Sequence, residues 1–157
     1  MDLVKDKAVR IILTGDVLFD SGKADLKPEA VESLRKIAGI LRETPYAINV
    51  VGHTDDVPIS TEEFPSNWEL STMRACVTAR FLMDEVAIPP SQVYVSGHAE
   101  YQPVRYDTDP ESRAANRRVE IIITKERPYG TPSPSQGTNL DERPQTGHDH
   151  IRPEDLR

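Results

Sequence analysis

The hydrophobic residues of this chain form short continuous runs that alternate with longer stretches of helical spacing. The short runs are rich in β-branched residues and are bounded by Gly, Pro or polar residues, which at this length favours strands over helices. They predict four strands, at residues 8–13, 46–51, 93–95 and 119–124.

Between these runs, two stretches place apolar residues three and four positions apart and predict amphipathic helices. The first begins at Pro28, because proline suits the first turn of a helix. The second begins at Ser66, which forms a capping box with Glu69, and Pro89 prevents it from extending much beyond residue 86. The apolar faces consist of Val31, Leu34, Ile37, Ala38 and Leu41 in the first helix and of Leu70, Met73, Val77, Phe81 and Leu82 in the second.

The predicted order of elements is strand, helix, strand, helix, strand, loop, strand. Helices that alternate with strands pack as a layer on the sheet, so this order predicts a two-layer α/β or α+β sandwich with its helices on one sheet face. We expect loops at residues 14–22, 53–65 and 97–113. The chain then becomes rich in Pro, Ser, Gly, Thr and charged residues, so we assign residues 1–126 to one domain and 127–157 to a disordered tail.

Composition and charge narrow the classes of function. The net charge of -7 argues against nucleic-acid binding, because such proteins usually present a clustered basic face. The single cysteine, Cys76, allows no intramolecular disulfide and does not identify a redox compartment. No run approaches the roughly 20 apolar residues that span a bilayer, and residues 1–10 lack the pattern of a signal peptide. If the domain works outside the cytoplasm, we expect its anchor or export signal upstream of Met1.

Asn67, Ser71 and Arg74 form a polar stripe on the second predicted helix, because they lie four and three positions apart. The stripe begins at the helix N-terminus, where free N–H groups and the helix dipole favour an anion. Arg74 adds a planar guanidinium that can bind a carboxylate through two hydrogen bonds. The stripe therefore indicates a carboxylate site, with a solvated helix face as the commoner alternative.

Thr54 and Asp55 follow the second predicted strand, a position where loops often carry ligand contacts. Asp55 either pairs with Arg74 or binds the ammonium group of a ligand. An acid and an arginine side by side suit a zwitterion, such as the free end of a diamino acid. A structural turn aspartate is the alternative interpretation.

Other groups of reactive residues give weaker signals. His53, Asp55, His98 and Glu100 lack the spacing of a zinc motif, so we expect no metal and no cofactor. Ser71 has no Gly-x-Ser-x-Gly turn and no evident base, so we expect no catalytic residues and no enzyme activity.

Arg113, Arg117 and Arg118 form a basic cluster before the last predicted strand. An anionic polymer is one explanation of this cluster. Local ion pairs with Glu111 and Glu120 are the other, which we favour for all but Arg118.

Four separated motifs resemble those of OmpA-like domains. They are residues 19–26 (FDSGKADL), 51–55 (VGHTD), 67–75 (NWELSTMRA) and 113–120 (RAANRRVE), and their order and spacing match over residues 9–124. The segments DDVP at residues 55–58 and SNWELS at residues 66–71 are similar to the MotB branch of this family. Departures are small, such as His98 and Ala99 where a glycine is common.

This resemblance implies an α+β fold of the order β-α-β-α-β-(α)-β, a two-layer sandwich with helices packed on one face of a mixed four-stranded sheet. It also implies non-catalytic, noncovalent binding of peptidoglycan, in which Asp55 and Arg74 hold the diaminopimelate of the stem peptide. The same resemblance implies a pocket that contains Thr54, Asn67, Leu70, Ser71 and Ala75, with Phe19 and Asp20 at its rim and Arg118 as its support.

The resemblance further implies the role of a periplasmic cell-wall anchor. We expect the domain to be the soluble part of a protein held in the bacterial inner membrane, such as a flagellar motor stator. We also expect a homodimer and a membrane ion-channel partner subunit. Two alternatives stay open: a Pal- or OmpA-type envelope anchor outside the motor, and a dimerisation module without wall binding. Residues upstream of Met1 would decide between a stator and a Pal-like anchor.

Overall fold

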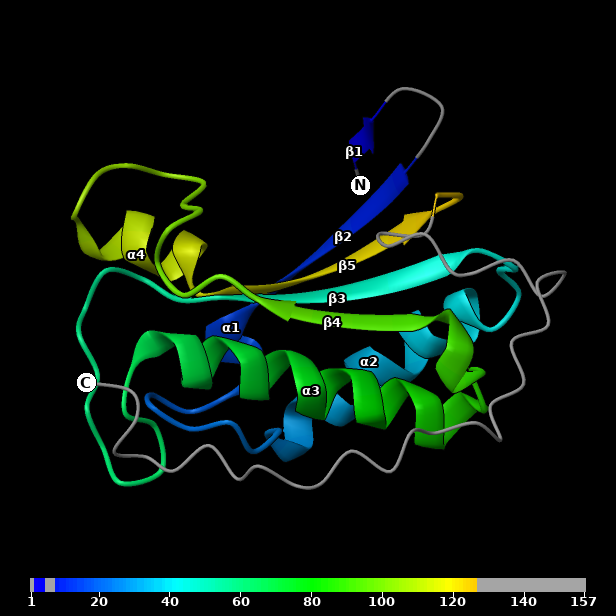
Figure 1. The fold of residues 1–157 in the computed structure, drawn as a ribbon, viewed down its shortest axis with the longest axis horizontal. Coiled ribbons are helices and arrows are strands. Elements are labelled where there is room, and N and C mark those ends of the chain that lie inside the picture. The colour runs from blue at the N-terminus through cyan, green and yellow to red at the C-terminus, as the bar shows by residue number, and fades with distance from the viewer. Residues whose placement is uncertain (1, 5–7, 127–157) are drawn as a thin grey trace, which may run out of the picture.

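A mixed five-stranded sheet forms one layer of the molecule, and helices form the other (Figure 1). The computed structural model describes residues 2–4 and 8–126. In their spatial order, the strands are β1 (Asp2–Val4), β2 (Ala8–Thr14), β5 (Arg118–Thr124), β3 (Ala47–His53) and β4 (Val93–Gly97). β3 and β4 run parallel, and the other neighbours are antiparallel. The four predicted strands are confirmed, and β1 is an additional edge strand that the sequence pattern does not predict.

Two long helices cover one face of the sheet (Figure 1). α2 (Pro28–Leu41) and α3 (Asn67–Val86) match the predicted helices. Ser66 caps α3 by accepting a hydrogen bond from the Trp68 N–H at 3.2 Å. The Ser66 hydroxyl also donates to the Glu69 carboxylate, so the two residues of the predicted capping box contact each other through their side chains.

Short helices occupy parts of two segments that are predicted as loops. α1 (Gly15–Leu18) follows β2 directly, and α4 (Pro110–Asn116) precedes β5. A 3-10 turn, η1 (Pro90–Gln92), leads into β4. α4 can begin where it does because the Asp109 carboxylate accepts a hydrogen bond from the Ser112 N–H at 2.9 Å. The loop predictions are therefore wrong at α1 and α4, and α4 is the optional helix that the family resemblance implies.

The core lies between the sheet and the two long helices. Met73 of the predicted α3 face is 46% exposed, so that face is wrong at this position, whereas Leu34, Ile37, Ala38 and Leu41 of the predicted α2 face pack on the core. Gly52 of β3 explains why another face of α3 meets the sheet. A Cβ at Gly52 would lie 1.9 Å from Ser71 O, so the helix touches the sheet at Ser71. α3 approaches the sheet so closely that small residues face it. The buried core includes Leu34, Ala38, Leu41, Ile48, Val50, Ala75, Ala79, Leu82, Val119 and Ile121.

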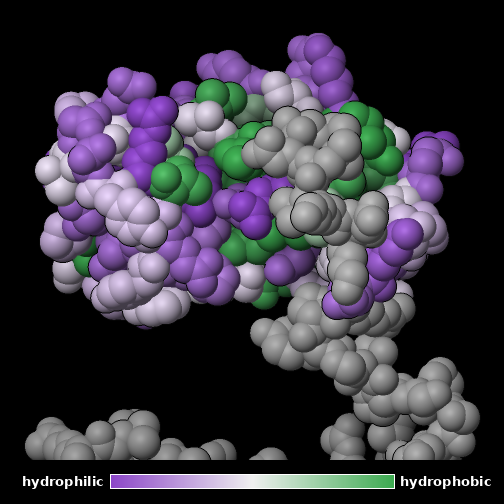
Figure 2. All heavy atoms as spheres, turned by 90° about the horizontal axis from the view of Figure 1, so that it is seen from above, coloured by the Kyte–Doolittle hydropathy of each residue, from purple (hydrophilic) through white to green (hydrophobic). Residues whose placement is uncertain are grey.

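The face of the sheet opposite the helices mixes apolar and charged residues (Figure 2). Since alternate residues of a strand point to opposite faces, Glu120 and Ile122 of β5 lie here. The buried Arg118 donates to the Glu120 carboxylate at 2.8 Å, and Arg10 lies 3.4 Å from its other oxygen. Ile12 is 51% exposed. This face therefore combines a buried ion pair with exposed apolar residues.

α3 has 20 residues, but polar and charged side chains occur along its whole length. In the part of the chain that the structure describes, no helix has both the length and the apolar character needed to cross a membrane. The tail predicted at residues 127–157 lies outside the described residues.

Candidate functional site

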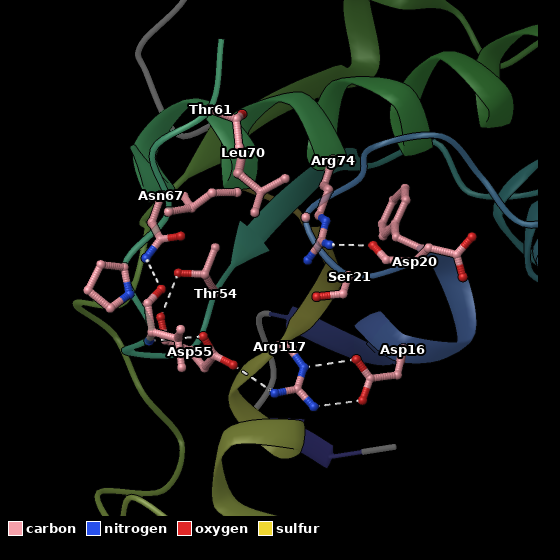
Figure 3. Close-up of a pocket in the computed structure, with 15 residues that line it drawn as sticks. Asp16, Asp20, Ser21, Thr54, Asp55, Thr61, Asn67, Leu70, Arg74 and Arg117 are labelled. Atoms are coloured by element: carbon pink, nitrogen blue, oxygen red, sulfur yellow. Dashed lines mark hydrogen bonds and ion pairs between the residues drawn. The ribbon is translucent and has the colours of Figure 1, made fainter. Parts of the chain in front are cut away.

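A pocket of about 800 Å³ opens beside the first half of α3 (Figure 3). This volume lies within the usual range of small-molecule sites. Its walls come from α1 with the turn that follows it, from the loop after β3, and from α3. The pocket is lined by Asp16, Phe19, Asp20, Ser21, Gly22, Thr54, Asp55, Val57, Pro58, Ile59, Thr61, Asn67, Leu70, Arg74 and Arg117.

The loop after β3 is held in place by backbone and side-chain hydrogen bonds. The Thr54 N–H donates to Ala99 O at 2.9 Å, which joins the segments that follow β3 and β4. One oxygen of the Asp55 carboxylate accepts from the Val57 N–H at 3.1 Å. The Asn67 amide donates to Val57 O at 3.0 Å and so ties the loop to α3. Asp55 therefore has the role of a turn aspartate through one oxygen, while its second oxygen accepts a hydrogen bond from Arg117.

Arg74 is a buried cation without a carboxylate partner among the described residues. Its Nε donates to Lys23 O at 2.8 Å and its Nη2 to Asp20 O at 3.2 Å, and the guanidinium lies 5.0 Å from the centroid of the Phe19 ring. Only 5% of the residue is exposed, and this burial lowers the pKa of the guanidinium, while the Asp16 carboxylate acts in the opposite direction. Arginine nevertheless stays protonated in proteins. The pocket therefore holds a desolvated positive charge that an incoming anion would neutralise.

Arg117 bridges two carboxylates on another side of the pocket (Figure 3). Its Nε and Nη2 donate to the two Asp16 oxygens, each at 2.8 Å, and its Nη1 donates to the second oxygen of Asp55 at 2.7 Å. The hydrogen bonds to Asp16 raise the pKa of Arg117 and lower the pKa of the Asp16 carboxyl. Gly15 allows the start of α1 to approach the backbone of Arg117, because a Cβ there would lie 2.7 Å from Arg117 O. Two carboxylates and one guanidinium give this side a negative charge.

The pocket thus separates a positive pole at Arg74 from a negative pole formed by Asp16, Asp55 and Arg117. A ligand with a carboxylate and an ammonium group on an aliphatic chain matches this arrangement. Apolar residues complete the lining and can contact such a chain: Val57, Pro58, Ile59 and Leu70.

Many of the predicted site residues line this pocket: Phe19, Asp20, Thr54, Asp55, Asn67, Leu70 and Arg74. Ser71, Ala75 and Arg118 lie outside it, because the close approach of α3 turns Ser71 and Ala75 toward the sheet. The Ser71 hydroxyl donates to Trp68 O at 3.1 Å. Arg118 does not line the pocket but lies on the sheet face opposite the helices, where it contacts Glu120, so the support that we expect from it stays a prediction.

Asp16 and Arg117 are pocket residues that the sequence analysis missed. Asp55 pairs with Arg117 and not with Arg74, which corrects one of the two expectations for this aspartate. Asp16 and Arg117 are separated by 101 positions along the chain. No local pattern links residues so far apart, and only the pairing of β2 with β5 brings them together.

The other basic residues of the cluster also pair differently from the prediction. Arg113 donates to the Asp56 carboxylate at 2.7 Å rather than to Glu111. Arg118, which the sequence analysis excepts from local ion pairs, pairs with Glu120. The three arginines of the cluster therefore bind different carboxylates: Arg113 binds Asp56, Arg117 binds Asp16 and Asp55, and Arg118 binds Glu120.

His53 is the last residue of β3 and lies directly before the pocket loop. It is 3% exposed, its ring stacks on His98 with centroids 5.5 Å apart, and its Nε2 lies 3.9 Å from a Glu120 oxygen. Neither ring nitrogen has a hydrogen-bond partner within the described residues. Burial and the nearby Arg118 cation lower the pKa of His53 to about 4, so the ring is neutral at pH 7. Across residues 8–126, no group of His, Cys, Asp and Glu is arranged to hold a metal ion.

Comparisons with known proteins agree on one family. The model of the OmpA family matches residues 18–117. Motility protein B of Bacillus subtilis is 38% identical over 114 residues, which are 72% of this chain and 44% of that protein. The chain spans about half the length of the curated relatives it matches.

Solved structures agree with this result and confirm the α+β fold. The cell wall anchor of the T6SS from Pseudomonas aeruginosa has a TM-score of 0.72 and 35% identity, and the match covers 76% of this chain and 83% of that one. The periplasmic domain of Helicobacter pylori MotB has a TM-score of 0.71 and 27% identity, and the match covers 78% of this chain and 79% of that one.

Proposed function

Since the chain belongs to the OmpA family and resembles its MotB branch, we propose that it binds peptidoglycan noncovalently and anchors a larger protein to the cell wall. The solved relative described as a cell wall anchor supports this role. So does the pocket, which has the size and the charge distribution of a binding site for a small zwitterion.

The observation that carries the proposal is the buried Arg74 guanidinium, which has no carboxylate partner within the described residues. A carboxylate of meso-diaminopimelate in the stem peptide would supply that partner. The ammonium group of the same residue would lie against Asp55. The group of Asp55, Asp16 and Arg117 has two carboxylates and one guanidinium, so its net charge is negative. Thr54, Asn67 and Leu70 would contact the rest of the ligand.

The pocket favours binding over catalysis. Its lining contains neither His nor Cys, and the charges of its arginine and aspartate side chains point to recognition of a charged ligand. We therefore propose a binding domain without enzyme activity.

We further propose that the domain works in the periplasm, as part of a protein held in the inner membrane. A flagellar motor stator that forms a homodimer and works with an ion-channel subunit is the first candidate, because of the likeness to Motility protein B. An envelope anchor outside the motor is the second candidate, because the T6SS anchor is also similar.

Sedimentation with insoluble cell walls tests the proposal. The wild-type chain and Asp55→Ala are mixed with sacculi that contain diaminopimelate, and with sacculi that contain lysine in its place. We expect the wild type to sediment only with the diaminopimelate wall, because lysine lacks the second carboxylate that Arg74 would bind. Asp55→Ala should sediment weakly with either wall. Equal binding to both walls would mean that the pocket does not recognise diaminopimelate, and no sedimentation would refute wall anchoring by this chain.

A further inference from the structure

Two exposed aromatic rings stack on each other at the end of the molecule that holds the pocket. Trp68 is the second residue of α3, and Tyr101 follows β4. Their ring centroids lie 5.3 Å apart with an angle of 24° between the planes. Trp68 is nonetheless 48% exposed and Tyr101 65% exposed. This aromatic pair therefore presents apolar ring surface to solvent, although large aromatic side chains are usually buried.

The aromatic pair is held in a defined position. The Ser71 hydroxyl donates to Trp68 O at 3.1 Å and accepts from the Ala99 N–H, also at 3.1 Å. The Tyr101 N–H donates to His98 O at 3.2 Å. These bonds join the start of α3 to the segment after β4. The backbone segments that carry the two rings are therefore joined to each other before a ligand binds.

The aromatic pair adjoins the pocket. Asn67, the residue before Trp68, lines the pocket and bonds to the loop after β3. The Thr54 N–H of that loop bonds to Ala99 O, two residues before Tyr101. The first turn of α3 thus carries a pocket wall and, one residue later, an aromatic ring. A polymer whose side branch enters the pocket has the aromatic pair beside it.

The exposed rings and the polar residues next to them in the chain suit a sugar ring. A pyranose ring presents C–H groups on its face and hydroxyl groups at its edge, so it stacks on an aromatic ring and needs polar groups around that ring. Polar side chains flank both rings in the chain, namely Glu69, Glu100 and Gln102. A stable protein interface would need about 800 Å² per partner with a largely apolar centre. Two rings among polar neighbours provide much less than that.

We propose that Trp68 and Tyr101 bind the sugar rings of a glycan strand whose stem peptide occupies the pocket. The identity of the strand rests on the proposed function, whereas the stacking of sugar on this pair stands on its own geometry. The pair would add affinity for the wall polymer that the pocket alone does not provide.

Intrinsic fluorescence tests this directly, because Trp68 is the only tryptophan of the chain. The full chain is titrated with glycan strands from which an amidase has removed the peptides, and with a soluble chito-oligosaccharide. We expect a saturable change in Trp68 emission with both. Tyr101→Ala should weaken the response roughly five-fold, the equivalent of one lost stacking contact. Tyr46→Ala removes another exposed tyrosine, one that lies before the start of β3 and outside the aromatic pair, and it should respond like the wild type.

Binding to intact sacculi separates this proposal from the proposed function. Arg74→Ala should lose most binding to intact sacculi but keep the response of Trp68 to peptide-free glycan. A wild type that ignores sacculi but still responds to glycan would refute the pocket and support the aromatic pair. If neither saccharide changes the emission, or if Tyr101→Ala responds as strongly as the wild type, the pair does not bind glycan.

Discussion

Removal of the Arg74 guanidinium is the most direct perturbation of the pocket. Among the described residues it donates only to the carbonyl oxygens of Lys23 and Asp20, so a ligand carboxylate would be its first anionic partner in direct contact there. Losing a charged hydrogen bond in a desolvated site costs about 2 to 4 kcal/mol. Arg74→Ala should therefore weaken binding to diaminopimelate sacculi by a factor of about 30 to 1,000.

The same substitution also changes the folded protein, and this effect must be measured separately. Alanine removes two hydrogen bonds to the turn after α1 and the contact with the Phe19 ring, but it also removes the cost of burying a charge. We therefore expect the free energy of unfolding to fall by no more than about 2 kcal/mol. Arg74→Lys keeps the charge without the two-pronged geometry, so its loss of binding should be intermediate.

The assay is sedimentation with diaminopimelate sacculi over a series of protein concentrations, combined with urea unfolding of each variant. Arg35→Ala is the control, because it also removes one guanidinium but breaks only a surface pair with Glu85 at 3.0 Å. It should bind like the wild type. If Arg74→Ala stays folded and keeps an affinity within about three-fold of the wild type, the guanidinium does not hold the ligand.

Three further predictions concern stability. The pKa of His53 is about 4 in the folded protein and about 6.5 when unfolded, so the unfolded state takes up a proton first as the pH falls. The contribution of His53 to the free energy of unfolding should be constant above pH 6.5 and fall by about 3 kcal/mol toward pH 4, and a His53→Asn variant should lack this contribution in urea unfolding. Arg117→Ala leaves Asp16 and Asp55 without their shared cation, so the free energy of unfolding should fall by about 1 to 2 kcal/mol and the Asp16 pKa should rise in a carboxyl NMR titration. Ala87 is exposed at the C-cap of α3 with φ of 54°. Its replacement by glycine should raise the free energy of unfolding by about 0.5 to 1 kcal/mol, measured by urea unfolding. No increase would mean that the left-handed conformation of Ala87 costs nothing.

The sequence predicts those parts of the fold that depend on neighbouring residues. The bounds of α2 and α3 follow from apolar spacing together with Pro28 and Ser66, which act within one helical turn. β1 and α1 have three and four residues, too few to show a period. The face of α3 that meets the sheet depends on Gly52, which lies on another element, so spacing within the helix could not identify it.

The site was predictable to the extent that its residues belong to local motifs. Thr54 and Asp55 follow a strand, and Asn67 and Arg74 share a helix face, so these two walls of the pocket could be identified from the sequence. The motif at residues 116–118 was identified, but the sequence pointed to Arg118 and not to its neighbour. Arg117 is the residue that reaches the pocket, because adjacent residues at the start of a strand point to different sides.

The two arginines of the pocket occupy opposite electrostatic situations. Arg117 contacts two carboxylates and has a raised pKa, whereas the contacts of Arg74 within residues 8–126 are carbonyl groups and a ring, and its pKa is lowered. Asp20 contributes its carbonyl to Arg74 while its carboxylate stays 77% exposed. A fold selected for stability alone would gain from a carboxylate at Arg74 or from an apolar residue in its place. The uncompensated charge is therefore a cost of the free protein that a bound anion would recover, and for this reason we assign recognition of the ligand carboxylate to Arg74 and not to Arg117.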